Sequence, residues 1–385
     1  MKLDYGRIFL LGFGFFGISL VWSIYNSYVP VFLAKGFALP AAMVGFIMTL
    51  DNIAALFIQP VIGVVSDATR TPIGRRMPYL LIGAPIAAIA FALVPLGRSL
   101  PLFMGTIIVM LLAMSVFRTP TIALMPDITP SPLRSKANGV INLMGGLGAL
   151  LAFFVGAKLY DMGRPAPFWV SSVVLVLAIL VVFWKIKEPK EYTEKAADAP
   201  ANLRKDLRVV WAEGGSSALS LLLAIFFWFL GYTAIEAFFT LYGVEVLKIK
   251  ESSAAFMLGF LALTFLVFAI PSGFIATRFG RRPTIIIGLA IMLASTLVPF
   301  FMPSTAVVQI ILVTAGFGWA LININSLPMV VDISTESLLG TFTGLYYLFS
   351  TLAAIAGPTV AGTMIQNTGN NYSTLFLMAP ACMAM

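Results

Sequence analysis

Long apolar stretches alternate with short polar segments along the whole chain. A helix needs about 20 predominantly apolar residues to cross the hydrocarbon core of a bilayer, and eleven stretches reach about that length. They cover residues 8–33, 39–65, 78–97, 101–125, 137–160, 167–186, 217–246, 252–277, 283–302, 304–330 and 340–366. Within them apolar and polar positions do not alternate, as they would in the strands of a membrane β-barrel. The pattern therefore predicts an all-α integral membrane protein.

A further apolar segment begins near Tyr372 and ends at Met385. It is shorter than the roughly 20 residues that a span requires. Either the sequence is a fragment of a twelve-helix protein or the last helix is a stub, and we favour the fragment. We expect a twelfth helix that is incomplete in this chain.

The composition agrees with a membrane protein and narrows the possible chemistry. Only 10% of the residues are charged and 60% are apolar, against about 25% charged in a soluble domain. Histidine is absent and Cys382 is the one cysteine, which excludes His-based triads, His zinc sites and disulfides. The sequence also has no Walker-type phosphate motif. We expect no enzyme activity, no metal and no cofactor, so that a proton or sodium gradient would drive any transport.

The net charge of +8 is explained by membrane topology and does not indicate nucleic-acid binding. Cytoplasmic loops of membrane proteins carry an excess of Lys and Arg. With the N-terminus inside, 17 of the 24 Lys and Arg residues fall in inner segments and 6 in outer segments. We therefore expect a multi-pass protein of the cytoplasmic (plasma) membrane, with its N-terminus inside, that contacts membrane lipid, binds no nucleic acid and functions as a monomer.

Two loops repeat at nearly the same spacing, which indicates two homologous halves. Asp127-Ile-Thr returns as Asp332-Ile-Ser after 205 residues, and Arg75-Arg76 returns as Arg281-Arg282 after 206. We predict two pseudo-symmetric bundles: a six-helix bundle over residues 1–187, and a second over 217–385 with five full helices and a partial sixth. The segment between them, residues 188–216, has mixed charge and is predicted to be a cytoplasmic linker.

Two parallel halves of six spans without a catalytic centre resemble the major facilitator superfamily. Residues 273–282, GFIATRFGRR, fit that family's loop motif G-x-x-x-D-R-x-G-R-R, with Thr277 where an acid is usual. In the first half Gly63 and Asp67 are in place, but four extra residues precede Gly74-Arg75-Arg76. This longer form is similar to the loop of the sucrose-transporter-like and glycoside–pentoside–hexuronide cation symporters. A second motif, R-x-P-x-x-A-L-x-P-D at 118–127, also resembles the sugar-transporter branch.

The resemblance implies a secondary transporter whose two halves rock to give alternating access to a substrate held between them near the midplane. The loop motif would supply gating residues: Gly63, Asp67, Gly74, Arg75, Arg76, Arg278, Gly280, Arg281 and Arg282. On physical grounds Asp67 can pair with a base of a neighbouring helix and form a cytoplasmic latch that breaks when the protein faces inward. The alternative is that these charges only determine topology, because anionic lipid attracts each arginine by about 1 kcal/mol.

Three ionisable residues lie well inside predicted spans: Asp51, Arg118 and Glu236. A charge that faces lipid costs roughly 2.5–3.5 kcal/mol, so these side chains are expected to face a cavity or one another. We predict that Asp51 pairs with Arg118 and couples transport to protons, the alternative being a permanent structural ion pair. Glu236 follows Gly231, which allows a local helix break, and is a second candidate for coupling or else an outer gate residue.

A sugar site combines planar hydrogen-bonding groups with aromatic faces. Helical spacing places aromatic and amide side chains on common stripes of the first and seventh predicted spans. With Arg118, the candidate substrate-binding residues are Trp22, Tyr25, Asn26, Asn52, Trp228, Tyr232 and Asn325. For the aromatic residues, packing or a position in the interface belt is the alternative.

The leading functional hypothesis is proton-coupled symport of a sugar or glycoside. A drug or organic-cation antiporter is an alternative, although it would not be expected to bury an arginine such as Arg118. A transport-inactive membrane receptor or assembly partner is another.

Overall fold

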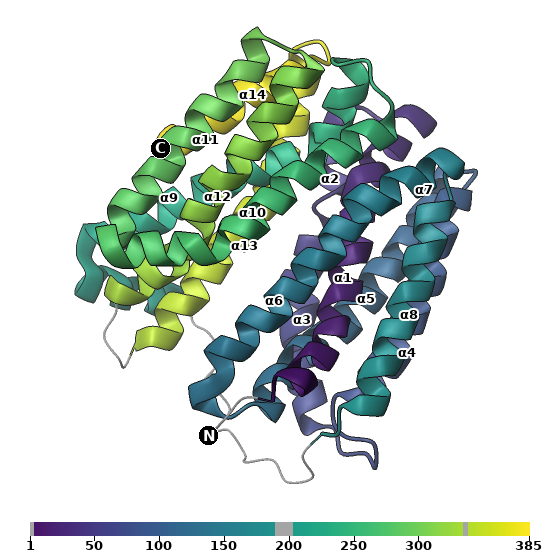
Figure 1. The fold of residues 1–385 in the computed structure, drawn as a ribbon, viewed down its shortest axis with the longest axis vertical. Helices are drawn as coiled ribbons and strands as arrows, with labels where there is room; N and C mark the ends of the chain where they lie inside the picture. Colours follow the sequence, from purple (N-terminus) through teal and green to yellow (C-terminus); the bar gives the residue numbers. More distant parts are fainter. Residues whose placement is uncertain (1–3, 189–202, 334–337) are drawn as a thin grey trace. The chain divides into compact units, whose positions relative to one another are not determined.

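A computed structural model describes residues 4–188, 203–333 and 338–385 of the chain, which are largely helical (Figure 1). The elements of the first half are α1 (Tyr5–Val31), η1 (Phe32–Gly36), α2 (Ala41–Ile47), α3 (Leu50–Ala68), α4 (Met77–Leu93), η2 (Val94–Leu96), α5 (Leu100–Ile128), η3 (Ser131–Leu133), α6 (Arg134–Leu151), η4 (Ala152–Gly156), α7 (Ala157–Met162) and α8 (Ala166–Lys185). Those of the second half are α9 (Leu203–Glu245), α10 (Glu251–Phe279), α11 (Arg281–Phe301), α12 (Thr305–Ile333), α13 (Leu339–Asn367), η6 (Tyr372–Thr374) and α14 (Leu375–Ala384).

Across the described ranges, eleven helical segments are long and apolar enough to cross a membrane. This number confirms the eleven predicted spans. The segment near the end of the chain forms the short apolar helix Tyr372–Ala384. The all-α membrane fold is therefore confirmed.

The second predicted span is not one continuous helix. α2 ends at Ile47 and α3 begins at Leu50, with a turn at Met48 and Thr49. In this turn the backbone N–H of Thr49 donates to the carbonyl of Phe46 at 3.0 Å, and the Thr49 hydroxyl donates to the same carbonyl at 2.7 Å. The interruption places Asp51 in the first turn of α3.

The seventh span, in contrast, is continuous where the sequence allowed a break. α9 runs without a break from Leu203 to Glu245, so the helix passes through Gly231, where a break seemed allowed. A Cβ at Gly231 would meet Cβ of Cys382 at 3.1 Å and the carbonyl of Ala379 at 3.2 Å, and this glycine therefore serves close packing against α14. α9 also begins inside the predicted linker, of which residues 189–202 lie outside the described part of the chain.

The chain forms two compact units. Unit 1 comprises residues 1–38, 50–192 and 250–259, and unit 2 comprises 39–49, 193–249 and 260–385. α2 therefore belongs to unit 2, while the first residues of α10 belong to unit 1.

Within unit 1, α1 packs against α6 and α8, and α4 packs against α5 and α8 (Figure 1). The start of α10 is held in the same unit by polar and aromatic contacts: the Ser252 hydroxyl donates to Asp161 at 2.6 Å, and the rings of Phe154 and Phe256 lie 4.9 Å apart.

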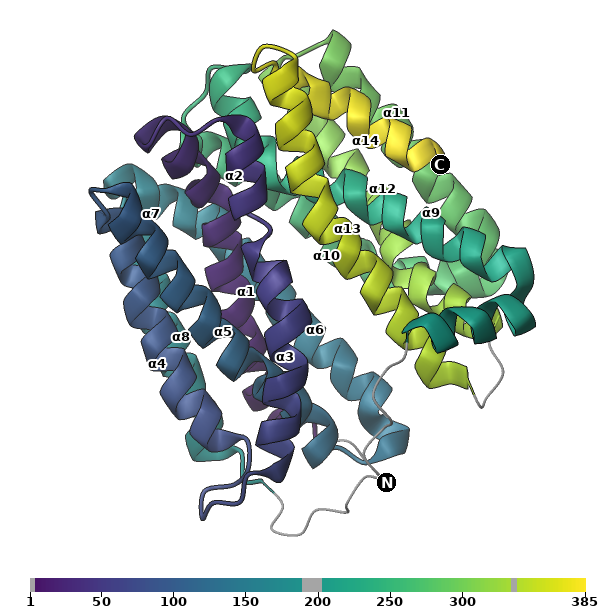
Figure 2. The ribbon, with the colours of Figure 1, turned by 180° about the vertical axis from the view of Figure 1, so that it is seen from behind.

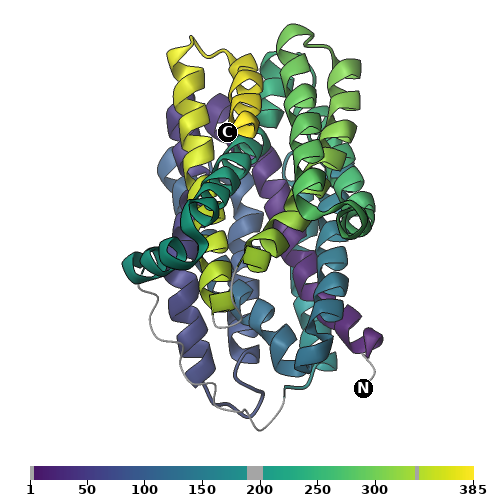
Figure 3. The same ribbon diagram turned by 90° about the vertical axis from the view of Figure 1, so that its left-hand side faces the viewer.

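Within unit 2, α13 packs against α9 and α2 (Figure 2), and α14 packs against α9 and α11 (Figure 3). α2 lies very close to α13, because a Cβ on Gly45 would collide with the carbonyl of Pro358.

The two halves share backbone irregularities at equivalent positions. Gly74 and Gly280 have φ of 118° and 92°, values that glycine adopts readily because it has no Cβ. Ala38 and Lys248 have φ of 52° and 56°, although positive φ is uncommon outside glycine. Gly280 follows Gly74 by 206 residues, and Lys248 follows Ala38 by 210 residues. Both separations are close to the 205 and 206 residues that separate the repeated loops.

Candidate functional site

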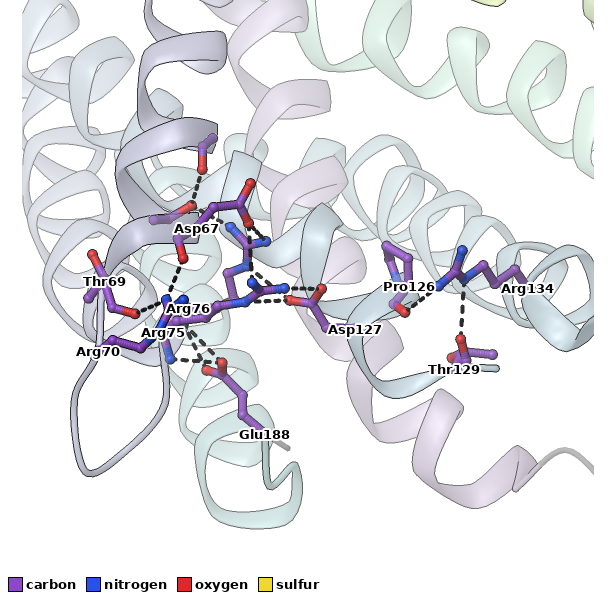
Figure 4. Close-up of polar contacts among 12 residues, drawn as sticks. Asp67, Thr69, Arg70, Arg75, Arg76, Pro126, Asp127, Thr129, Arg134 and Glu188 are labelled. Carbon is purple, nitrogen blue, oxygen red and sulfur yellow. Dashed lines mark hydrogen bonds and ion pairs between the residues drawn. The ribbon is translucent and has the colours of Figure 1, made fainter. Parts of the chain in front are cut away.

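A cluster of charged side chains lies in unit 1 near the ends of α3 and α5 (Figure 4). The Asp127 carboxylate accepts hydrogen bonds from Nε of Arg76 at 3.0 Å and from Nη2 of Arg75 at 2.5 Å. The Asp67 carboxylate pairs with Nη1 of Arg75 at 3.5 Å and makes a close contact with Arg76. Arg76 is only 3% exposed, and a buried charge needs such partners because an unpaired one is costly. Two carboxylates of the same unit therefore neutralise the two arginines.

Glu188, which follows α8, binds the backbone of the same loop. Its carboxylate accepts hydrogen bonds from the N–H groups of Arg75 at 2.9 Å, Arg76 at 3.0 Å and Met77 at 2.8 Å. The first N–H groups of a helix lack partners within the helix and favour negative charge. Glu188 therefore caps α4 from a position more than 100 residues away in the chain. Figure 4 shows this carboxylate beside the arginine pair.

The second-half copy of the motif lies in unit 2 and has fewer partners. Arg281 forms an ion pair with Asp332 and also donates to the carbonyl of Pro328 at 2.5 Å. Thr277, at the position of the missing acid, donates its hydroxyl to the carbonyl of Gly273 at 2.9 Å. Arg278 and Arg282 are exposed. Each unit thus has an ion pair between an arginine of the loop and an aspartate near the end of the fourth predicted span of its half. These pairs are Arg76–Asp127 in unit 1 and Arg281–Asp332 in unit 2.

In unit 1, polar side chains of three helices gather near the interruption of the second span. Asp51 is half-buried in the first turn of α3, and Asn52 donates to its carboxylate at 2.9 Å. Arg118 of α5 interacts electrostatically with Asp51, as does Tyr25 of α1. Because the N-terminus of a helix carries partial positive charge, the start of α3 and Arg118 both present positive charge to the Asp51 carboxylate.

The predicted stripe on α1 divides into half-buried and fully buried members. Trp22 and Asn26 are half-buried, whereas Tyr25 is fully buried and its ring lies edge-on to that of Trp22 at 5.5 Å. Within the described residues, Nε1 of Trp22 and the Tyr25 hydroxyl are buried without a hydrogen-bond partner. An unsatisfied buried polar group is unfavourable by about 1–3 kcal/mol, so each of these two groups is a candidate to bind a polar ligand atom.

Unit 2 presents an aromatic platform. The Tyr232 and Trp319 rings stack with centroids 4.1 Å apart and planes within 5°, and Phe229 lies edge-on to Trp319 at 5.2 Å. Trp319 is buried, whereas Tyr232 is half-buried and interacts electrostatically with Glu236 one turn further along α9. Glu236 is also half-buried. A carboxylate thus lies beside a supported aromatic face.

Trp228 and Asn325 lie inside unit 2. Trp228 is 5% exposed, and Asn325 is 3% exposed. The Asn325 amide donates to the Ser272 hydroxyl at 2.8 Å and to the carbonyl of Leu321 at 2.9 Å. These contacts connect α12 with α10, and they leave the half-buried Asn323 as the more accessible amide of this segment.

Residues 11–358 match the model of the Major Facilitator Superfamily. The chain belongs to the Major Facilitator Superfamily. This superfamily is one of secondary transporters and not of enzymes.

Individual superfamily members are similar over much of the chain. The isoprimeverose transporter of Lactiplantibacillus pentosus is 22% identical over 299 residues, which cover 74% of this chain and 61% of that protein. The uncharacterized symporter YjmB of Bacillus subtilis (strain 168) is 26% identical over 324 residues, covering 80% and 69%. The crystal structure of a mutant of the nucleoside transporter NupG has a TM-score of 0.77 at 15% identity, covering 99% and 97%.

These comparisons confirm the superfamily and its fold. The chain spans about half the length of several curated relatives that it matches. The structural likeness to NupG, at 15% identity, is evidence for the fold alone.

For this superfamily member, two residues of the charged cluster were absent from the predicted site. Asp127 carried a signal, because the same Asp recurs as Asp332 in the second half. Glu188 carried none, because its partners are backbone N–H groups that only the folded chain brings near it.

Proposed function

We propose that this superfamily member is a symporter that carries a sugar or glycoside together with protons by alternating access. The observation that carries the proposal is the position of Asp51, at the start of a helix that begins inside a membrane span and in electrostatic contact with Arg118. Interrupted helices and intramembrane acids are typical of ion and substrate sites in transporters. The names of the two sequence relatives above support a sugar and symport.

Asp51 would carry the proton. When it is ionised, it holds Arg118, and Asn52 donates a hydrogen bond to it. When it takes up a proton, the Coulomb attraction to Arg118 disappears, and the guanidinium is released to bind substrate hydroxyls with its five N–H donors. Release of the proton recaptures the arginine. This exchange links the proton to the substrate through one side chain.

Each unit, taken by itself, offers planar polar groups and aromatic faces as candidate substrate contacts. In unit 1 the candidates are Trp22, Asn26, Asn52 and Arg118, with Tyr25 behind them. In unit 2 the half-buried face of Tyr232, supported by Trp319, suits the apolar face of a sugar ring. Glu236, beside this face, is the second candidate for proton coupling.

The protein would lie in the plasma membrane with its N-terminus inside, as bundles over residues 1–187 and 217–385. The charged cluster of unit 1 and the Arg281–Asp332 pair of unit 2 would act as latches that form and break during transport.

The test is uptake into proteoliposomes. Sugars are first ranked by thermal shift, starting with sucrose and isoprimeverose, and the best one is supplied with an inward proton gradient, an inward sodium gradient or neither. We expect accumulation with the proton gradient alone. Drug or organic-cation exchange without sugar uptake would support the antiporter alternative instead.

Variants then identify the coupling acid. Asp51→Asn should allow downhill exchange of the sugar but abolish accumulation, and Glu236→Gln shows whether the second acid contributes. Asp4→Asn is a matched control, because Asp4 is exposed and an Asn can still accept the hydrogen bond that Asp4 receives from the Arg7 backbone. Accumulation that persists in both Asp51→Asn and Glu236→Gln would exclude coupling by these acids.

A further inference from the structure

The turn between α10 and α11 in unit 2 carries exposed positive charge. Arg278 lies in the last turn of α10 and Arg282 in the first turn of α11, on either side of Gly280. Both are exposed, and no carboxylate in the described ranges pairs with either of them. Arg281 between them is already paired with Asp332. The turn therefore presents two guanidinium groups that are available to an anion.

The equivalent turn in unit 1 shows what this sequence can bind. There the N–H groups that follow Gly74 hold the Glu188 carboxylate, and Asp67 and Asp127 neutralise the arginines. In unit 2, Gly280 has the same left-handed backbone, but no described side chain accepts a hydrogen bond from the N–H of Arg281 or Arg282. Among the described residues, the repeated Gly-Arg-Arg sequence thus binds an internal anion in the first half but not in the second.

The surroundings of the unit 2 turn are apolar. Phe279 is 64% exposed, and the Arg278 guanidinium lies 5.5 Å from the centre of its ring. Along α11 every fourth residue from Arg282 is exposed, namely Ile286, Ala290 and Ala294, so that these residues lie on one side of the helix. An arginine thus ends an apolar stripe. A ligand that fits must be anionic at one end and apolar along its length.

We propose that an anionic phospholipid binds at this turn, with its phosphate on Arg278 and Arg282 and an acyl chain along the exposed stripe of α11. The N–H groups of Arg281 and Arg282 add donors for the phosphate, since the start of a helix favours anions. A zwitterionic lipid offers the same phosphate but adds a positive headgroup, which the two arginines repel. The site therefore selects for lipid with net negative charge.

Native mass spectrometry of the delipidated full chain tests the proposal. Phosphatidylglycerol and phosphatidylcholine are titrated separately against the unmodified protein and against Arg278→Gln, Arg282→Gln and the double variant. Each arginine near anionic lipid contributes about fivefold in affinity, so each single variant should bind phosphatidylglycerol about fivefold more weakly and the double variant about 25-fold more weakly. The matched control is Arg98→Gln, which removes an exposed arginine between η2 and α5 and should bind as the unmodified protein does.

Measurements on the unmodified protein keep the test decisive if a variant fails to fold. Preference for phosphatidylglycerol over phosphatidylcholine supports the site, and equal binding of the two overturns it. Complete displacement of phosphatidylglycerol by inorganic phosphate at equal concentration would show a site for a free anion and overturn a lipid site. Undiminished binding by a folded double variant would also overturn it.

Discussion

Nε of Arg76 donates a hydrogen bond to the Asp127 carboxylate at 3.0 Å, although 51 residues separate the two in the chain. Only 4% of the Arg76 side chain and 11% of the Asp127 side chain are exposed. Loss of one partner from a buried pair costs about 3–5 kcal/mol, whereas exposed pairs contribute about 0–1 kcal/mol. We expect Asp127→Asn to lower the free energy of unfolding by about 3 kcal/mol.

Asp67 provides the matched comparison, because it pairs with the same arginine while its side chain is 58% exposed. Asp67→Asn should lower the free energy of unfolding by less than about 1 kcal/mol. Thermal unfolding of both variants in one detergent measures the difference. Equal losses would show that burial does not determine the strength of these pairs.

Glu188 is expected to hold the start of α4 in place. Glu188→Ala removes the acceptor for three backbone N–H groups, and loss of a helix cap costs about 1 kcal/mol. Hydrogen exchange at Arg76 and Met77 should therefore accelerate about fivefold, which corresponds to that free energy. Glu188→Gln, which keeps one acceptor oxygen, should show a smaller change. Exchange that is unaltered in Glu188→Ala would mean that α4 begins stably without this cap.

Asp51 and Arg118 should behave as a coupled pair in stability as well as in transport. Removal of either charge alone leaves the other unbalanced within the membrane, at a cost of roughly 2.5–3.5 kcal/mol. The double variant Asp51→Asn, Arg118→Gln should therefore be more stable than Asp51→Asn alone, by about 1 kcal/mol or more. A double-mutant cycle of unfolding free energies measures this coupling, and strictly additive effects would show that the two charges act independently.

Two glycines of α13 should respond oppositely to the same substitution. A Cβ on Gly362 would collide with the backbone carbonyl of Ala41 at the start of α2, whereas a Cβ on Gly344 would meet nothing within 4 Å. Gly362→Ala should destabilise the protein by about 1–3 kcal/mol, the range for overpacking, and Gly344→Ala should stabilise α13 by up to about 1 kcal/mol. Paired thermal unfolding of the two variants tests this difference in sign.

The membrane spans were predictable because each depends only on local composition. The repeat of Arg75-Arg76 as Arg281-Arg282 also indicated the two halves before any contact was known. Both features can be recognised in short segments of sequence, and the predictions of the fold and the superfamily were based on them.

The helix interruption was harder to predict because it depends on packing. The turn at Met48 and Thr49 contains neither glycine nor proline, and the helix before it belongs to unit 2 while the helix after it belongs to unit 1. Gly231 offered a local signal for a break, but α14 packs against it and the helix continues. At Gly231, a contact with a distant helix therefore outweighed the local signal.

Only part of the candidate site could be predicted from the sequence, for a similar reason. The pairing of Asp51 with Arg118 was predicted because charges inside a membrane need partners, and it remains a prediction. Helical spacing could not determine which residue of a stripe turns inward, and it gave no reason to expect Asn325 to bond with Ser272. Such pairings depend on how neighbouring helices rotate about their axes.

The left-handed backbone shared by Ala38 and Lys248 lies just after the first membrane span of each half. Neither residue is glycine, and the two differ in size and charge, yet φ agrees to within a few degrees. The tight bend after the first span of each half is therefore formed with a small apolar side chain in one half and a long charged one in the other.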